Sequence, residues 1–126
     1  MPGSAKLWIS LGAVAALTGV ALGAFGAHAL KVQLAGDMLA VWRTAVEYQM
    51  YHALGLLAIG VLALHLPRSV PLKWAGALMA TGIVLFSGSL YVISLTGLRG
   101  LGVITPVGGL AFIAGWAALA WAVLRG

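Results

Sequence analysis

Charged residues are scarce in this chain: they make up 7% of its 126 residues, and only Asp37 and Glu47 are acidic. Soluble domains carry about 25% charged residues, and a surface with so few charges would not stay dispersed in water. Cysteine is absent, which excludes disulfides, thiolate nucleophiles and thiolate metal ligands. Because 63% of the residues are hydrophobic, the composition predicts a protein that is embedded in a membrane.

Long apolar runs fill the chain and are separated by short links. Each membrane-spanning helix needs about 20 apolar residues, so the length allows about four of them. We therefore expect an all-α integral membrane four-helix bundle with short links. It would form a single transmembrane domain over residues 1–126, with spans at about 6–29, 38–66, 71–94 and 104–124.

Lysine and arginine stand singly near the ends of the apolar runs, and the net charge is +5. This pattern is typical of anchoring to anionic lipid headgroups, so we expect membrane lipids and not nucleic acid as partners. The side that holds both termini would carry four basic residues, namely Lys6, Arg68, Lys73 and Arg125. The other side would carry Lys31, Arg99 and Arg43. The positive-inside rule then predicts that both termini are cytoplasmic.

Small residues recur along the first apolar run and at the start of the fourth. Gly19 and Gly23 form a G-x-x-x-G pattern, which lets another helix approach closely. The residues expected to pack helices in this way are Gly12, Gly19, Gly23, Gly26, Gly108 and Gly109. An A-x-A-like site at 27–29 also fits a signal peptide, but the run is long enough to cross a bilayer, and we favour a retained helix.

The stretch from Trp42 to His52 is the most polar part of the chain. At about 100° per residue, Arg43, Glu47 and Tyr51 share one half of a helix with Tyr48 and His52, whereas Gln49 lies apart. Arg43 and Glu47 are four residues apart and can pair, although the acid follows the base, which is the less favourable order on a helix. Asp37 precedes this helix and is predicted to be its N-cap.

A charged side chain near the bilayer centre costs roughly 3 kcal/mol or more, so an acid there is expected to face a protein partner. In one interpretation, Arg43 and Glu47 form a structural pair at the interface. In a second, Glu47 and His52 line a polar cavity for a small molecule, ion or lipid headgroup, and in a third they relay protons. A fourth places a metal between His28, His52 and Glu47, but no ligand pair has metal spacing, and we predict neither metal nor cofactor.

Four motifs follow one another in the chain: GAFGAHAL at 23–30, WRTAVEYQMYHALG at 42–55, FSGSLY at 86–91 and LGVITPVGG at 101–109. Together they resemble the family known as domain of unknown function 423, which has a eukaryotic relative called transmembrane protein 256. The similarity covers essentially the whole chain. It implies a multi-pass protein of the bacterial inner (plasma) membrane with four spans, and it supplies no reaction, substrate or catalytic residue.

The leading hypothesis is a non-enzymatic membrane protein that associates with itself as a homo-oligomer. It would bind a small molecule or lipid in a polar pocket around Glu47 and His52, with Arg43 neutralising Glu47. The candidate pocket residues are Glu47, His52, Arg43, Tyr48, Tyr51, His28, Ser87, Ser89 and Tyr91. One alternative is a transporter or channel component that uses Glu47 and His52 as an ion or proton site. Another is an enzyme acting on a lipid, although no catalytic residues are visible.

Overall fold

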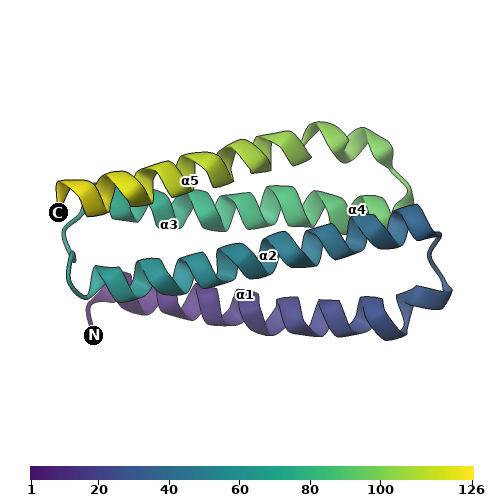
Figure 1. Ribbon diagram of the computed structural model, residues 1–126, viewed down its shortest axis with the longest axis horizontal. Helices are drawn as coiled ribbons and strands as arrows, with labels where there is room; N and C mark the ends of the chain where they lie inside the picture. The colour runs from purple at the N-terminus through teal and green to yellow at the C-terminus, as the bar shows by residue number, and fades with distance from the viewer.

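A computed structural model describes all 126 residues, and it consists of helices joined by short links (Figure 1). The long helices form four rods, of which the third is divided into α3, a π-helical segment η2 and α4. Two short 3-10 helices, η1 and η3, lie in links. The elements in chain order are α1 (Gly3–His28), η1 (Leu30–Val32), α2 (Gly36–Ala63), α3 (Val70–Gly82), η2 (Ile83–Ser87), α4 (Gly88–Thr96), η3 (Arg99–Val103) and α5 (Thr105–Arg125).

All four rods are long and apolar enough to cross a membrane. They comprise 26, 28, 27 and 27 residues, the last including η3. At about 1.5 Å per residue, each is about 40 Å long, which exceeds the roughly 30 Å of a bilayer's hydrocarbon core. The predicted fold class, an all-α membrane bundle of four helices, is confirmed.

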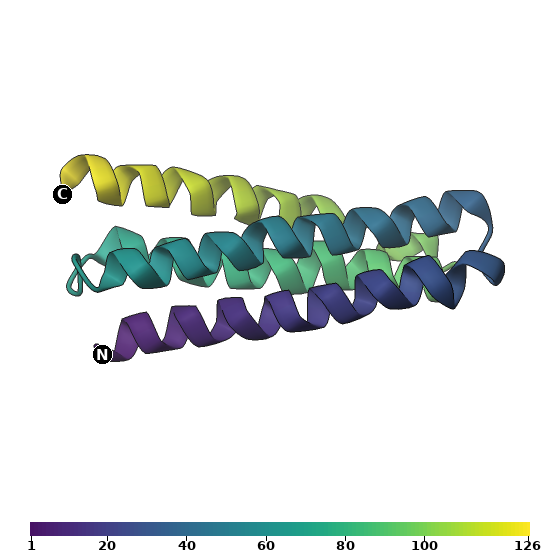
Figure 2. The same ribbon diagram turned by 60° about the horizontal axis from the view of Figure 1, so that its bottom comes forward.

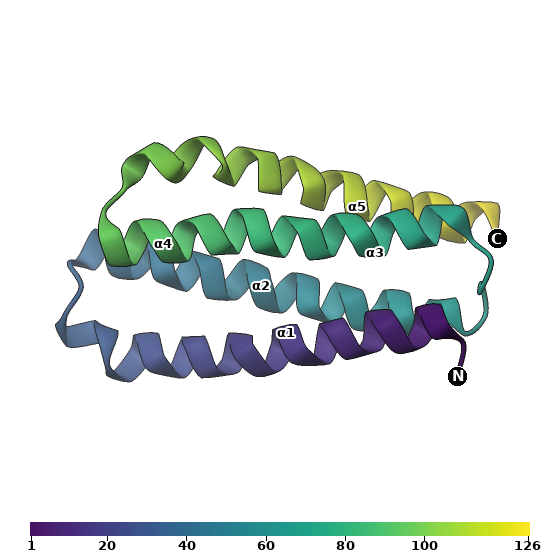
Figure 3. The same ribbon diagram turned by 180° about the vertical axis from the view of Figure 1, so that it is seen from behind.

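The rods form two helical hairpins that pack side by side. α1 packs along α2, and α3 packs along α5. Because α2 also contacts α3 and α4, it lies where the two hairpins meet (Figure 2). Both termini and the link 64–69 lie at one end of the bundle, while the links 29–35 and 97–104 lie at the other (Figure 1, and from behind in Figure 3). We call these the terminal end and the far end.

The apolar core lies toward the terminal end. Leu56 and Ile59 of α2 and Met79 of α3 are completely shielded there. Trp8 of α1 and Ala122 of α5 join the same cluster, so all four rods contribute to it. The polar half of α2 lies outside this cluster, toward the far end, and it is there that the candidate site residues are found.

Glycines allow α1 and α2 to approach each other very closely. A Cβ added at Gly12 would lie 2.9 Å from the carbonyl oxygen of Ala53 and 2.9 Å from the backbone nitrogen of Leu57. Such close approach of backbones is typical of membrane helices that pack through small residues. The other glycines predicted to pack from this run also face α2: Gly19, Gly23 and Gly26.

Asp37 is not the N-cap of α2, which corrects the sequence-based prediction. The helix already begins at Gly36, and the capping residue Ala35 offers no side-chain acceptor. Instead, a carboxylate oxygen of Asp37 accepts a hydrogen bond from Nη2 of Arg99 at 3.2 Å. This exposed ion pair joins the first turn of α2 to the link 97–104 at the far end. At the terminal end, α2 stops at Ala63, earlier than the predicted residue 66.

The third rod contains an irregularity that its apolar sequence does not reveal. The residues Ile83–Ser87 are wound as a π-helix, which changes the direction of the side chains that follow. Gly108 of α5 packs directly on this segment, and a Cβ at Gly108 would collide with the backbone of Phe86. The bulge and the glycine therefore fit each other, and they bring α5 close to the middle of the bundle.

Candidate functional site

The buried face of α2 is centred on Gln49. The buried residues from its first turns to Leu56 are Leu39, Trp42, Ala45, Gln49, His52, Ala53, Gly55 and Leu56. If Arg43 is set at 0°, a rotation of about 100° per residue puts Gln49 near 240° and Glu47 near 40°. Arg43, Glu47 and Tyr51 are accordingly exposed. The structure therefore does not bring Glu47 and His52 together in one pocket.

Gln49 connects three helices through its side-chain amide. Its Nε2 donates to the carbonyl oxygen of Ala15 at 2.9 Å and to the hydroxyl of Thr18 at 2.8 Å, both on α1. Its Oε1 accepts from the hydroxyl of Tyr91, on α4, at 2.6 Å. The side chain is 5% exposed. Both ends of the amide are thus used inside the bundle, which makes Gln49 the central polar contact of the interior.

Other buried polar groups on or against this face bind backbone carbonyls of neighbouring helices. Nε1 of Trp42 donates to the carbonyl oxygen of Leu22 at 2.9 Å. The hydroxyl of Ser87 donates to the carbonyl oxygen of Ala45 at 2.7 Å. No buried side-chain nitrogen or oxygen lacks a hydrogen-bond partner. These contacts hold the helices in register, and they leave no unpaired polar group in the interior.

His52 is buried, and both of its ring nitrogens are engaged. Nε1 of Trp116 donates to Nε2 of His52 at 2.9 Å, and Nδ1 of His52 lies 2.7 Å from the carbonyl oxygen of Tyr48. Because an indole N–H only donates and a carbonyl only accepts, Nδ1 carries the proton and the imidazole is neutral. The ring of Phe112 stacks on it, with 3.5 Å between centroids. His52 therefore joins α2 to α5.

An aromatic groove runs along the outside of this junction. Its volume is about 640 Å³. The rings of Tyr48 and Phe86 lie 4.6 Å apart at one wall, and Trp116 lies at the other. The groove is open at the surface of the bundle, and the full set of lining residues is Tyr48, His52, Phe86, Pro106, Gly109, Leu110, Phe112, Ile113 and Trp116.

The hydroxyl of Tyr48 is the polar group of the aromatic groove that is left unbonded. Tyr48 is 37% exposed, and its hydroxyl makes no hydrogen bond within the chain, whereas Trp116 and His52 bind each other. Tyr51 stacks edge-on against Tyr48 at 5.7 Å and is 54% exposed. Of the predicted pocket residues, Tyr48 and His52 are therefore neighbours in one groove, with Tyr51 beside them.

Ser89 and Tyr91 of α4 have structural partners instead of a shared pocket. The hydroxyl of Ser89 lies 2.6 Å from that of Thr105 and donates to the carbonyl oxygen of Phe86 at 2.9 Å. The bond from Ser87 of η2 to α2 and the contact of Ser89 with Thr105 of α5 tie the third rod to the helices on both sides of it. The two predicted serines thus lie in the packed interior, and Tyr91 is partly buried beside it.

Arg43 and Glu47 line a second, shallow groove on the opposite side of α2. Its other lining residues are Gly23, Gly26, Ala27, Trp42 and Val46. The only ion pair in the structure is Arg99–Asp37, so the guanidinium nitrogens of Arg43 lie more than 4.0 Å from the carboxylate oxygens of Glu47. The predicted pairing of Arg43 with Glu47 within one chain is wrong. The two side chains share a groove without neutralising each other.

His28 stands apart from the other candidates. It is the last residue of α1 and is exposed at the far end. The structure contains no group of three histidine, aspartate or glutamate side chains close enough to hold a metal ion. His28, His52 and Glu47 therefore lie at three separate places.

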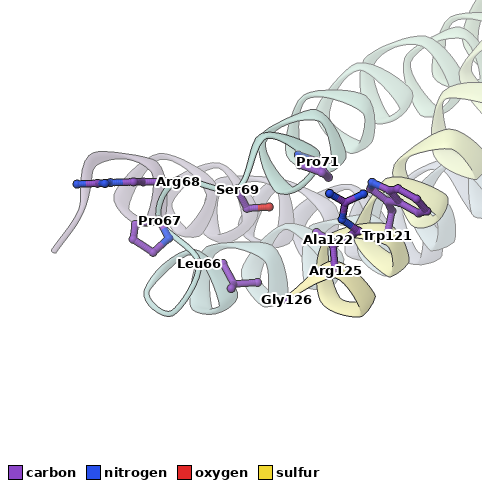
Figure 4. Close-up of a pocket in the computed structure, with 9 residues that line it drawn as sticks. All are labelled: Leu66, Pro67, Arg68, Ser69, Pro71, Trp121, Ala122, Arg125 and Gly126. Carbon is purple, nitrogen blue, oxygen red and sulfur yellow. The ribbon is translucent and has the colours of Figure 1, made fainter.

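A hollow at the terminal end lies between the link 64–69 and the end of α5. Figure 4 shows its lining residues, with Arg125 close to the indole of Trp121 and Arg68 on the far side of the link. The guanidinium carbon of Arg125 is 5.3 Å from the ring centroid of Trp121, which is a cation–π contact. Because the two arginines do not converge, the hollow offers no anion site built from both.

Sequence signals for the central role of Gln49 were present. Gln49 falls on the same helical face as Trp42, Ala45 and Leu56, and this stripe of large and small packing residues marks the buried side. Arg43, Glu47 and Tyr51 are more conspicuous in the sequence, but they lie on the other, exposed face of α2. Two aromatic partners of His52, Phe112 and Trp116, come from α5 and have no local signal in the sequence around His52.

The chain is similar to membrane proteins of several bacteria. A family model described as "Protein of unknown function (DUF423)" matches residues 22–109. A UPF0382 membrane protein of Staphylococcus haemolyticus is 53% identical over 111 residues, covering 88% of this chain and 89% of that protein. The UPF0382 membrane protein YwdK of Bacillus subtilis is 50% identical over 120 residues, covering 95% of this chain and 98% of that protein. No solved structure matches the chain.

Proposed function

We propose, from the premise that this chain belongs to the DUF423 family of membrane proteins, that it binds a lipid-like molecule in the aromatic groove between α2 and α5. The observation that carries the proposal is the unbonded hydroxyl of Tyr48 inside an otherwise apolar, aromatic groove. A polar group of this kind, at the wall of an apolar groove, fixes the orientation of a ligand that is mostly hydrocarbon.

The dimensions and walls of the groove suit an elongated apolar chain. Its volume of about 640 Å³ lies within the range of small-molecule sites. Leu110 and Ile113, on its outer rim, are 65% and 67% exposed, so a ligand enters sideways from the bilayer. The hydrocarbon would lie against Phe86 and Trp116, and an oxygen of the ligand would bind the hydroxyl of Tyr48.

The interior of the bundle supports binding over transport or catalysis. An ion path or a proton relay would need polar side chains that are free to exchange partners. Gln49 is bonded to α1 and α4, and both nitrogens of His52 are bonded to protein atoms. Glu47 lies outside on the other face of α2. The polar groups of the interior are thus better suited to hold the helices together than to carry an ion.

We also propose that the protein lies in the bacterial plasma membrane with both termini in the cytoplasm. The terminal end carries Lys6, Arg68, Lys73 and Arg125, whereas the far end carries Lys31 and Arg99, the latter paired with Asp37. The positive-inside rule favours this orientation. Since the chain lacks cysteine, Ser69→Cys and Gln33→Cys can be labelled singly with an impermeant maleimide in whole cells. Labelling at Gln33→Cys alone is expected, and labelling at Ser69→Cys alone would reverse the orientation.

Photolabelling tests the binding proposal. The protein would be exposed in bilayers to a phospholipid with a diazirine on its acyl chain and, separately, to an isoprenoid alcohol with a diazirine. We expect labelled peptides from the groove walls at Phe86 and in the first half of α5. Gly109→Leu should reduce this labelling several-fold, because the new side chain fills the groove while its Cβ has only one neighbour, 3.9 Å away.

Two further variants sharpen the test. Gly88→Leu adds the same side chain where no atom lies within 4 Å of the added Cβ, and it should leave the labelling unchanged. Tyr48→Phe should reduce the labelling by the probe whose oxygen binds the hydroxyl, which identifies the class of lipid. Equal labelling of Gly109→Leu and the unmodified protein by both probes would refute the proposal.

A further inference from the structure

Glu47 lies deep in the membrane-spanning part of α2 and is nevertheless exposed on the outside of the bundle. The helix has 28 residues, Gly36–Ala63, so Glu47 lies only about 4 Å from its midpoint along the axis, at about 1.5 Å per residue. The ion pair of Asp37 marks the far end, about 15 Å away on the same scale. A glutamate side chain is too short to reach the headgroups from this depth.

Arg43 is exposed on the same face, one turn closer to the far end. Its long side chain can extend toward the headgroups, whereas Glu47 has no basic group of its own chain within ion-pair distance. Ionisable residues inside a membrane are almost always paired or turned toward protein or water. The position of Glu47 therefore requires a partner that this single chain does not provide.

The surface beside Glu47 is shaped for a close neighbour. The shallow groove between α1 and α2 has a volume of about 140 Å³, and Gly23, Gly26 and Ala27 form its α1 side. A Cβ added at Gly23 would meet only one atom, of Val46, at 3.3 Å. The backbone of α1 is thus accessible next to the two charges, and a further helix can approach it as closely as small residues permit.

The two charges make this face complementary to itself. In a two-fold dimer, a residue i that contacts j receives the same contact in return, so one acid and one base on a shared face form two equivalent pairs. A two-fold axis along the membrane normal also keeps both copies in the same orientation. We propose that two copies of this chain associate through the α1–α2 face, with Arg43 of each copy bound to the partner's Glu47.

Charge exchange gives a direct test. Arg43→Glu leaves two acids on the face, and Glu47→Arg leaves two bases, so each variant alone should dimerise at least about tenfold more weakly in bilayers. Mixing the two variants should restore association, because every acid then faces a base. The double variant Arg43→Glu/Glu47→Arg should also dimerise with itself. Association would be measured by energy transfer between labelled copies in liposomes as the ratio of lipid to protein is raised.

Two controls separate pairing from folding and from general charge. Each variant must keep the helical circular dichroism of the unmodified protein. Lys31→Glu, exposed at the far end, should leave the dimer unchanged. Ala27→Cys adds a second readout, because the chain has no other cysteine and a disulfide can then form only between two copies.

Each contrary outcome overturns the proposal in a specific way. If the unmodified protein is monomeric at every lipid ratio, the face has no second copy as its partner. If single charge reversals dimerise as well as the unmodified protein, the dimer uses another face. If the mixture of reversals does not associate, Arg43 and Glu47 do not pair between copies, and a lipid or a different membrane protein occupies the face. None of these outcomes bears on the aromatic groove, which lies on a different side of α2.

Discussion

On one face of α2, Gln49 is buried and bonded to two other helices, whereas on the opposite face Glu47 is exposed and has no ion-pair partner. The two residues differ by a single chemical group, an amide in place of a carboxylate. They lie two positions apart in the chain and at almost the same depth. The fold therefore buries the neutral side chain and leaves the ionisable one on the surface.

The difference follows from what each group needs. A side-chain amide can donate and accept, and two neighbouring helices are enough to satisfy it without any net charge in the interior. A buried carboxylate needs a cation and further donors, and without them its desolvation is not compensated. Within one chain the bundle interior offers Gln49 its partners and offers no cation, so the acid remains on the surface, where another molecule can reach it.

The inner face should tolerate added volume far less than the outer surface. Gly12→Leu places a side chain against the backbone of α2 at Ala53 and Leu57, and backbone atoms cannot move aside without separating the two helices. We expect the free energy of unfolding to fall by about 3 kcal/mol. Unfolding of the monomeric protein in mixed detergent micelles, followed by circular dichroism, would measure the loss.

The matched control for this prediction is Gly88→Leu. An added Cβ at Gly88 has no neighbour within 4 Å, and leucine favours a helix more than glycine does. The control should therefore be as stable as the unmodified protein or more so. Equal destabilisation by both substitutions would show that glycine itself, and not the closeness of α1 and α2, determines the stability.

The architecture of the bundle could be predicted from the sequence because hydropathy and length alone define membrane spans. The positions of the links were accessible for the same reason, since Pro67, Pro71 and Pro106 stand at or next to them. The π-helical segment could not be predicted, because Ile83 to Ser87 reads as ordinary apolar helix. Its cause lies in another helix, where Gly108 packs against the bulge.

The candidate site was only partly accessible to sequence reasoning. In water, the apolar side of a helix is its buried side, but lipid is as apolar as a protein core, so hydropathy does not reveal which face of a membrane helix is buried. The polar residues of α2 therefore did not show which of its faces is buried. Tyr48 and His52 do lie at a groove, but Glu47 and Arg43 face the other way, and Gln49 is the residue that holds the interior.

The smallest expected effect, that of Gln49→Leu, tests the difference between Gln49 and Glu47 most directly. Gln49→Leu keeps a side chain of similar size but removes the bonds to Thr18, Ala15 and Tyr91. Hydrogen bonds between membrane helices contribute about 0.6 kcal/mol on average, so the monomer should lose about 2 kcal/mol. Glu47→Leu should leave the stability of the monomer unchanged, because in one chain this side chain makes no bond.

A double-mutant cycle measures how much of this loss of stability comes from the bond between Gln49 and Tyr91. Tyr91→Phe removes only the hydroxyl that donates to Gln49, at 2.6 Å in the structure. If that bond exists, the combined variant Gln49→Leu/Tyr91→Phe is less destabilised than the sum of the two single variants, by about 1 kcal/mol. Additive effects would mean that the two residues do not interact. A larger loss for Glu47→Leu than for Gln49→Leu in the monomer would reverse the assignment of the inner and outer faces of α2, because the residue that holds the interior must be the one whose removal weakens a single chain.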